Sequence, residues 1–199
     1  MIHLITLICL LFFVMPAHAD TLTLISGSAN DGQYYVGALT ASLNGQAIPG
    51  GITCLDTGHE SYLGTSWSVA VHTLRDVSGT MFGDLIKYEE AAWLLSQFAG
   101  NPGQVAQIQH AVWDLFHPGY SGDTETWLTQ AQGINPADYS YASVTIYTPI
   151  EAGIGNQEFM SGGASKVPLP ATWLLLGSGL LGMMIAKKRG RGDGSESDL

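Results

Sequence analysis

Two side chains in this sequence combine a reactive group with an unusual setting: the thiol of Cys54 and the amide of Gln109. The other cysteine, Cys9, lies in an apolar N-terminal segment of the kind removed on export, which leaves Cys54 alone in an oxidising compartment. Gln109 interrupts an apolar helical stripe that includes Val112 and Trp113, and a buried amide without partners costs about 1–3 kcal/mol. The structural interpretation is an inert buried thiol and a hydrogen-bonded amide. The chemical interpretation is that Cys54 acts as a nucleophile through its thiolate form. In this interpretation Gln109 interrupts the apolar stripe because it has a function.

A strand and a helix must position these two side chains. Alternation of polar and apolar residues predicts strands, and apolar spacing of three to four residues predicts helices. The expected strands are 21–25, 35–41, 47–55, 67–74, 143–148 and 157–160, and the expected helices are 86–99, 101–117 and 125–132. In the helix with Gln109 we expect Asn101 as N-cap, Pro102 in the first position and Gln104 completing a capping box. This order predicts an α+β fold, an antiparallel β-sheet or sandwich interrupted by a helical insertion, plus one C-terminal transmembrane helix.

The surroundings of both residues resemble the thioester domains of bacterial surface adhesins. Residues 109–113 read Gln-His-Ala-Val-Trp, similar to the Gln-x-Ala-aliphatic-Trp part of the TQXA motif, and residues 53–56 read Thr-Cys-Leu-Asp, similar to its upstream cysteine segment. Ile108 stands where the motif has Thr, and Thr53 stands where an aromatic residue or Leu usually precedes the cysteine. The resemblance implies an internal thioester between Cys54 and Gln109.

Such a thioester would form by attack of the thiolate on the amide carbon, with loss of ammonia. Asp56, His59 and His110 are the candidates to assist the thiol. The candidates to keep water away from the bond are Trp113, Trp93 and Tyr62. An amine on a surface or matrix component would then take the acyl group and remain attached as an amide. Because this is covalent adhesion without turnover, we do not expect an enzyme. The alternative is a noncovalent matrix- or carbohydrate-binding module in which Cys54 is merely buried and free.

The C-terminal stretch has three parts that are typical of a sorting signal. They are a motif of Val167, Pro168, Leu169, Pro170 and Ala171, an uncharged run to Ala186, and a basic cluster of Lys187, Lys188, Arg189 and Arg191. An apolar run of about 20 residues can cross a bilayer, and the basic end stays in the cytoplasm. The stretch 167–191 resembles the sorting signals of PEP-CTERM proteins in their VPLPA variant, which implies processing by an exosortase-type enzyme. The alternative is an ordinary single-span anchor.

The rest of the chain divides around one exported domain. Residues 1–19 have an apolar core and end in Ala-His-Ala, which is typical of a secretory signal peptide. We expect a thioester-like domain at 20–152, a Gly- and Ser-rich linker at 153–166, a transmembrane helix at 168–186 and an acidic tail at 192–199. The expected location is the inner membrane before processing, through the C-terminal helix, and then the cell surface or the extracellular matrix.

The charge balance narrows the range of partners. Residues 20–166 hold three basic residues against fourteen acidic ones, a formal charge of −11, which repels phosphate backbones and makes nucleic-acid binding unexpected. The sequence contains no hydrolase, metalloprotease or nucleotide-binding motif, and we expect neither a metal nor another cofactor. The remaining interpretations are the covalent adhesin and the noncovalent binding module, with a secreted enzyme of unrecognised type as the third.

Overall fold

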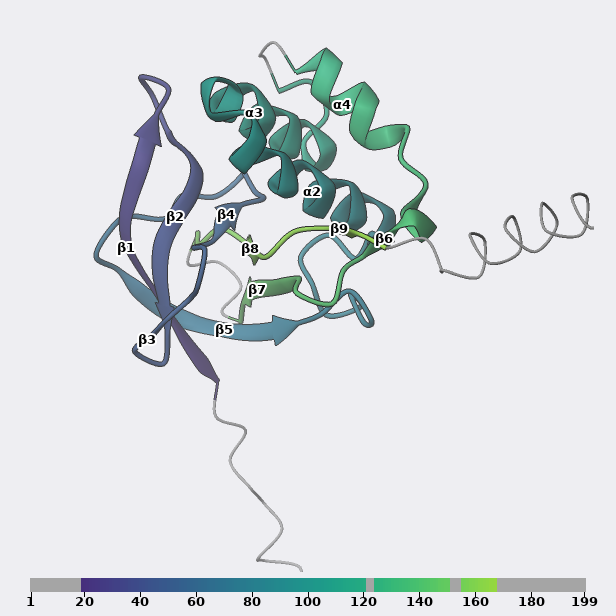
Figure 1. Cartoon of the computed structure of the whole chain (residues 1–199). Coiled ribbons are helices and arrows are strands. Elements are labelled where there is room, and N and C mark those ends of the chain that lie inside the picture. Colours follow the sequence, from purple (N-terminus) through teal and green to yellow (C-terminus); the bar gives the residue numbers. More distant parts are fainter. Residues whose placement is uncertain (1–18, 121–123, 151–154, 168–199) are drawn as a thin grey trace, which may run out of the picture. The chain divides into compact units, whose positions relative to one another are not determined.

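The fold is built on one large antiparallel sheet. The computed structural model describes residues 19–120, 124–150 and 155–167 (Figure 1). The strands are β1 (Asp20–Asn30), β2 (Tyr35–Leu43), β3 (Gln46–Ala47), β4 (Thr53–Cys54), β5 (Ser66–His72), β6 (Tyr139–Ser140), β7 (Thr145–Pro149), β8 (Phe159–Ser161) and β9 (Ser165–Lys166). In the described part of the chain, seven strands form a sheet in the order β3-β2-β1-β5-β7-β8-β4, and β6 pairs with β9. Strands from both ends of the domain are therefore neighbours.

The sheet curls so that its β4 edge returns to β2. Leu39 in β2 and Ile52 exchange two backbone hydrogen bonds, with the Leu39 amide to the Ile52 carbonyl at 2.7 Å and the reverse bond at 2.8 Å. Because Ile52 stands two residues before Cys54, this bridge places β4 next to β2 although the ladder separates the two strands by four others. On its other side β4 pairs with β8, where Cys54 lies opposite Phe159.

Three α-helices interrupt the strands between β5 and β6. They are α2 (Leu85–Gln97), α3 (Val105–Phe116) and α4 (Glu125–Gln132), with 3₁₀ turns at Phe98–Gly100, Pro102–Gln104 and Pro136–Asp138. The Asp84 carboxylate caps α2 by accepting hydrogen bonds from the amides of Ile86 and Lys87. Helix α3 lies between its neighbours and contacts α2, α4 and β2 (Figure 1). The predicted α+β fold, an antiparallel sheet interrupted by a helical insertion, is confirmed.

The start of α3 differs from the predicted capping box. Asn101 makes no side-chain cap, and its Nδ2 donates instead to the carbonyl of Gln97 in the preceding helix. The side chain of Gln104 accepts a hydrogen bond from the indole of Trp127 at 3.0 Å. A 3₁₀ turn beginning at Pro102 therefore replaces the first turn of the expected helix, because both polar side chains have partners in neighbouring elements.

Two segments differ from their predicted secondary structure. The expected strand 47–55 is split into β3 and β4, because Pro49 and Gly50 form a turn between them. The expected linker 153–166 is wrong for its described residues, since β8 lies inside the seven-stranded sheet and the Glu158 side chain is fully buried. At Gly162 the backbone of this segment packs closely against Ser143. A Cβ at Gly162 would lie 2.1 Å from the Ser143 carbonyl oxygen, so this glycine is required by packing.

Two apolar clusters meet at α3. Ile108 and Val112 of this helix are fully buried among the helices, whereas Trp113 is buried in the cluster beneath the sheet, with Cys54 and Phe159. Burying each large apolar side chain contributes about 1.5–3 kcal/mol, so α3 is held from both sides. Gln109 is the one polar side chain that α3 buries among its described residues, which places an amide at the junction of the two clusters.

The membrane-related predictions lie largely beyond the described residues. Within the described ranges, no helix is long and apolar enough to cross a membrane. The predicted helix 168–186 and the acidic tail 192–199 lie outside those ranges, as do all but the last residue of the predicted signal peptide 1–19. Of the sorting motif, only Val167 is described, and its side chain is exposed.

Candidate functional site

The amide of Gln109 reaches the backbone of Cys54. Its Nε2 donates to the Cys54 carbonyl oxygen at 2.8 Å, although the two residues are 55 positions apart in the chain. Gln109 is 1% exposed and Cys54 is 4% exposed, so water has almost no access to either. The curl of the sheet places Cys54 above α3, and the helical stripe turns Gln109 toward it. The two residues singled out in the sequence are therefore neighbours in the fold.

Gly37 completes this pair from β2. Its backbone amide donates to Oε1 of Gln109 at 3.1 Å in a buried environment. Gly37 has a φ of +76°, and a Cβ there would lie 2.6 Å from Cγ1 of Val105 in α3, so only glycine allows β2 to approach the helix this closely. The sequence prediction missed this residue. An isolated glycine within a strand pattern is the signal that could have found it.

The Cys54 thiol is held in its neutral form. It donates a hydrogen bond to the Asp56 carbonyl oxygen at 2.9 Å and has no disulfide partner. Burial raises the pKa of this thiol to about 12, although hydrogen bonding to the sulfur by the Asp56 backbone and the Trp113 indole acts in the opposite direction. In the described part of the chain the buried Nε1 of Trp113 has no hydrogen-bond partner of ordinary geometry, which leaves it available to the sulfur.

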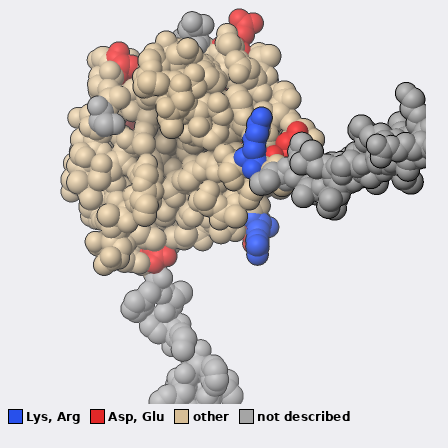
Figure 2. All heavy atoms as spheres, in the orientation of Figure 1, with Lys and Arg blue, Asp and Glu red and all other residues tan. Residues whose placement is uncertain are grey.

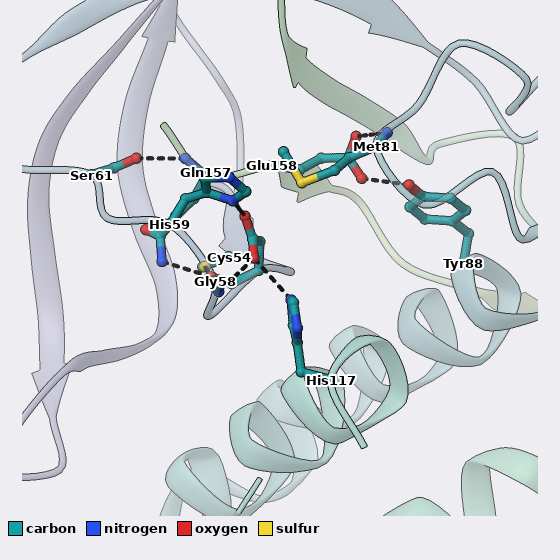
Figure 3. A network of polar contacts seen from close by, with 10 residues as sticks. Cys54, Gly58, His59, Ser61, Met81, Tyr88, His117, Gln157 and Glu158 are labelled. Atoms are coloured by element: carbon teal, nitrogen blue, oxygen red, sulfur yellow. Dashed lines mark hydrogen bonds and ion pairs between the residues drawn. The ribbon is translucent and has the colours of Figure 1, made fainter. Parts of the chain in front are cut away.

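Asp56 organises the chain just after Cys54. Its carboxylate is fully buried and accepts hydrogen bonds from the Gly58 amide at 2.7 Å and from Nε2 of His117 at 2.9 Å, and it also pairs with Nδ1 of His59 (Figure 3). The two imidazoles are partly exposed, so they connect the buried carboxylate to the surface. Of the predicted assistants, Asp56 contacts the Cys54 thiol through its backbone carbonyl, whereas His59 contacts the Asp56 carboxylate. His117, which the prediction did not include as an assistant, joins them from the end of α3.

A second buried acid supports β4 from the other side. The backbone carbonyl of Glu158 accepts the Leu55 amide at 2.9 Å, and its carboxylate accepts the Met81 amide at 2.8 Å and the Thr148 hydroxyl at 2.5 Å. The Tyr88 hydroxyl donates to the same carboxylate (Figure 3). Burial raises the pKa of Glu158 above its ordinary value of 4.5, against the effect of these hydrogen bonds. This network holds the strand that carries Cys54.

The raised pKa of Glu158 predicts a pH-dependent stability. Above pH 4.5 the unfolded chain releases this proton while the folded chain keeps it, so the free energy of unfolding falls as pH rises from 4.5 to the folded pKa. Glu158→Gln keeps an amide oxygen for Met81 and Thr148 and has no proton to lose. Urea unfolding of a Cys54→Ala parent across this pH range should show the decline, and the Glu158→Gln variant should be flatter. Parallel curves for the two proteins would contradict the assignment.

His110 takes a different position from the one expected of an assistant to Cys54. Its Nε2 hydrogen-bonds Oδ2 of Asp31 at 2.8 Å, in the turn between β1 and β2. Its ring stacks on Trp113 with centroids 5.4 Å apart and meets Tyr120 edge-on at 5.3 Å. Trp113 therefore contacts the His110 ring and also lies near the Cys54 thiol, and its role in keeping water away stays a prediction.

The described residues hold no cluster of three or more His, Cys, Asp or Glu side chains that could bind a metal ion. The polar groups that the structure places together here are the thiol, the amide and their hydrogen-bond donors. A thiol and a carboxamide held together without water can exchange an acyl group, provided that a donor stabilises the oxyanion which develops on the carbonyl. The Gly37 amide is such a donor.

Comparisons with known proteins concern both parts of the chain. Comparison with curated proteins finds no match. Two solved structures with a similar fold are N-terminal thioester domains of a surface protein from Clostridium perfringens, one of them a cysteine-to-alanine mutant. The mutant is 12% identical, with a TM-score of 0.44 over 74% of this chain and 99% of that chain. The other is 10% identical, with a TM-score of 0.41 over 74% of this chain and 100% of that chain. At the C-terminus, residues 166–189 match the PEP-CTERM protein-sorting motif, a signal for export to the cell surface and for processing by an exosortase-type enzyme.

Proposed function

We propose that Cys54 and Gln109 form an internal thioester, and that the exported domain uses it to attach covalently to amines at the cell surface or in the extracellular matrix. The observation that carries this proposal is the double hydrogen bonding of the Gln109 amide. Nε2, the atom that would leave, points to the Cys54 backbone, and Oε1, the atom that would carry negative charge, accepts the Gly37 amide. A merely structural glutamine needs partners, but it does not need a neighbouring thiol.

The reaction balances within the site. The Cys54 sulfur bonds to the side-chain carbonyl carbon of Gln109, the C–N bond breaks, and the thiol proton leaves with the amide nitrogen as ammonia. The Gly37 amide stabilises the oxygen of the tetrahedral intermediate, which is the function of an oxyanion-hole donor. The thiol proton is transferred to the leaving nitrogen during the reaction. The reaction therefore does not require a permanent thiolate, and it is compatible with the pKa of about 12 for Cys54.

The same burial that makes the thiol a weak acid protects the product. A thioester hydrolyses when water reaches it, and both bonded residues are at least 96% buried. An amine of a partner would attack the carbonyl carbon, form an amide with Gln109 and release the Cys54 thiol. The PEP-CTERM signal supports this use, because it sends the chain to the surface where such partners are. We propose that a helix over 168–186 anchors the chain in the inner membrane until it is processed.

The test compares the wild-type chain with Cys54→Ala by mass spectrometry. Signal-peptide and C-terminal processing affect both proteins equally, so their mass difference reports the site alone. We expect the wild-type protein to be lighter than its formula by one ammonia, and methylamine to add to Gln109 in the wild type but not in Cys54→Ala. After the reaction, denatured wild-type protein should show one free thiol.

Thiol labelling of native protein does not replace this measurement. A free Cys54 with a pKa of about 12 reacts slowly with thiol reagents in the folded state whether or not a thioester forms. Labelling is therefore done in denaturant, before and after methylamine. A wild-type mass equal to the formula, with no methylamine adduct, would contradict the thioester.

One observation favours the alternative of a noncovalent binding module. A surface pocket of about 420 Å³ is lined by the exposed ring of Tyr62, by Trp67, and by the polar side chains of Glu60 and Asn156. An aromatic face beside a carboxylate and an amide suits a sugar ring. Binding of glycans without any change in mass, lost in Tyr62→Ala, would support this module.

A further inference from the structure

A second pocket lies at the turn between β1 and β2. It has a volume of about 600 Å³ and is lined by Asp31, Gly32, Gln33 and Tyr34 of the turn between β1 and β2, together with His110 of α3 and Tyr120. The elements that form it also carry the reactive pair, because β2 continues from this turn to Gly37 and α3 continues from Gln109 to His110. On the face of the molecule shown in Figure 2, Asp and Glu side chains are scattered and form no extended patch.

The charged group of this pocket is Asp31. Its Oδ1 accepts the amides of Gln33 at 2.9 Å and Tyr34 at 2.8 Å, and its Oδ2 binds Nε2 of His110 at 2.8 Å. Partial burial raises the pKa of Asp31, but these hydrogen bonds together lower it by more, so the pKa is below its ordinary value of 3.8. Asp31 is therefore a carboxylate at neutral pH. A carboxylate can only accept, so the Nε2 of a neutral His110 carries the hydrogen and its Nδ1 is a base. No hydrogen-bond partner of that Nδ1 is found among the described residues.

The Trp113 indole contacts three rings that line the pocket and also lies near the Cys54 thiol. Trp113 contacts the rings of Tyr34, His110 and Tyr120, with centroids 5.8, 5.4 and 5.1 Å away. Its Nε1–H is buried without an ordinary partner and lies near the Cys54 sulfur. Trp113 is therefore common to the aromatic surroundings of the pocket and to the surroundings of Cys54.

We propose that this pocket binds the primary ammonium group of the adhesion partner, with Asp31 attracting the cation and His110 removing its proton before attack. This inference rests on the proposed thioester function. The aromatic rings of Tyr34 and Tyr120 add a surface that favours cations and excludes anions. The partner is thus a protein or polymer with flexible alkylammonium groups.

The proposed reaction moves two protons and transfers the acyl group of Gln109 from sulfur to nitrogen. The ammonium group gives one proton to Nδ1 of His110 and becomes a neutral amine. The amine nitrogen bonds to the carbonyl carbon of Gln109, the C–S bond breaks, and the second amine proton passes to the Cys54 sulfur. The products are an amide on Gln109, a free Cys54 thiol and an imidazolium that releases its proton to solvent.

The test uses two small nucleophiles that differ in charge. At neutral pH methylamine is a cation that must be bound and deprotonated, whereas hydroxylamine is already neutral. We expect Asp31→Asn and His110→Gln in the full chain to slow the methylamine reaction about tenfold or more and to change the hydroxylamine reaction less than about twofold. Rates are read from the mass of acid-quenched samples. The control is Asp76→Asn, because Asp76 also accepts a backbone amide two residues later but lies in a different turn.

Each outcome separates the inference from the function on which it rests. Retention of the ammonia deficit in a variant shows that its site folds and that the thioester forms. Equal slowing of both nucleophiles, or of neither, would overturn the ammonium pocket and leave the thioester in place. A wild-type chain without the ammonia deficit would overturn the proposed function, and the pocket's role with it. If Asp76→Asn slows the methylamine reaction as much as Asp31→Asn does, the slowing is explained by the lost negative charge alone, and the inference is overturned.

Discussion

Replacing Gln109 with Glu in a Cys54→Ala parent is expected to lower the free energy of unfolding at neutral pH by about 4 kcal/mol. The introduced carboxyl group would face the Cys54-position carbonyl oxygen, which accepts a hydrogen from Nε2 in the native chain. A carboxylate has no hydrogen to offer there, and the site is 1% exposed. The group must therefore stay protonated or bring an unpaired charge into the core. The alanine parent removes any thioester from the comparison.

The sign of the pH dependence follows from the raised pKa of this introduced group. Stability is retained below the unfolded pKa of about 4.3 and is lost as pH rises toward the folded value. Denaturant unfolding at several pH values checks this, with Gln107→Glu as the control, because Gln107 lies on the same helix and is partly exposed. A pH-independent loss, or a loss as large at Gln107, would show that Gln109 is not held as described. The Gln109→Glu change in a chain with Cys54 should also abolish the ammonia deficit, since no amide nitrogen remains to leave.

Gly37→Ala is expected to destabilise the fold by about 3 kcal/mol and to suppress thioester formation. The residue has a φ of +76°, and the added methyl group would lie 2.6 Å from Cγ1 of Val105. To avoid that contact β2 must move away from α3, which withdraws the Gly37 amide from the Gln109 carbonyl. Chemical denaturation measures the first effect, and the wild-type-minus-variant mass measures the second.

A matched glycine separates strain from contact. Gly45 has a φ of +79°, and nothing lies within 4 Å of a Cβ built on it, so Gly45→Ala should cost only about 1 kcal/mol and leave the thioester intact. Adding Val105→Ala to Gly37→Ala should recover part of the loss, and a double-mutant cycle isolates that coupling. Additive effects of the two substitutions would mean that β2 does not depend on this close approach.

Local pattern was sufficient for much of the fold and for two members of the site. Periodicity placed Gln109 on a buried helical stripe and Cys54 in a strand, and both expectations agree with the structure. The strand 47–55 and the linker 153–166 failed because Gly and Pro content indicates where a chain can turn and does not indicate what it packs against. Segment 155–166 is rich in small residues and still supplies β8 to the sheet.

The roles of individual polar residues were less predictable, because they depend on contacts between distant segments. His110 and His59 were indistinguishable as assistants in the sequence, but in the fold His59 joins Asp56 while His110 faces Asp31 across 79 positions. Gly37 carried only the weak signal of a glycine within a strand. Its function depends on a helix that begins nearly 70 residues later.

By itself, the sequence determined that strands at both ends of the domain flank a group of helices, that α3 buries an amide, that residues 20–166 hold a single cysteine and that a sorting signal follows, because each of these depends on residue types at short spacing. Only the tertiary structure decided that β4 curls back to β2, and thus that Cys54, Gly37 and Gln109 share one dry site. It also decided that Asp31 and His110 line one pocket and that the His110 ring stacks on Trp113. Hydrogen bonds act over about 3 Å, so residues far apart in the chain become partners only where the sheet and the helices bring them together.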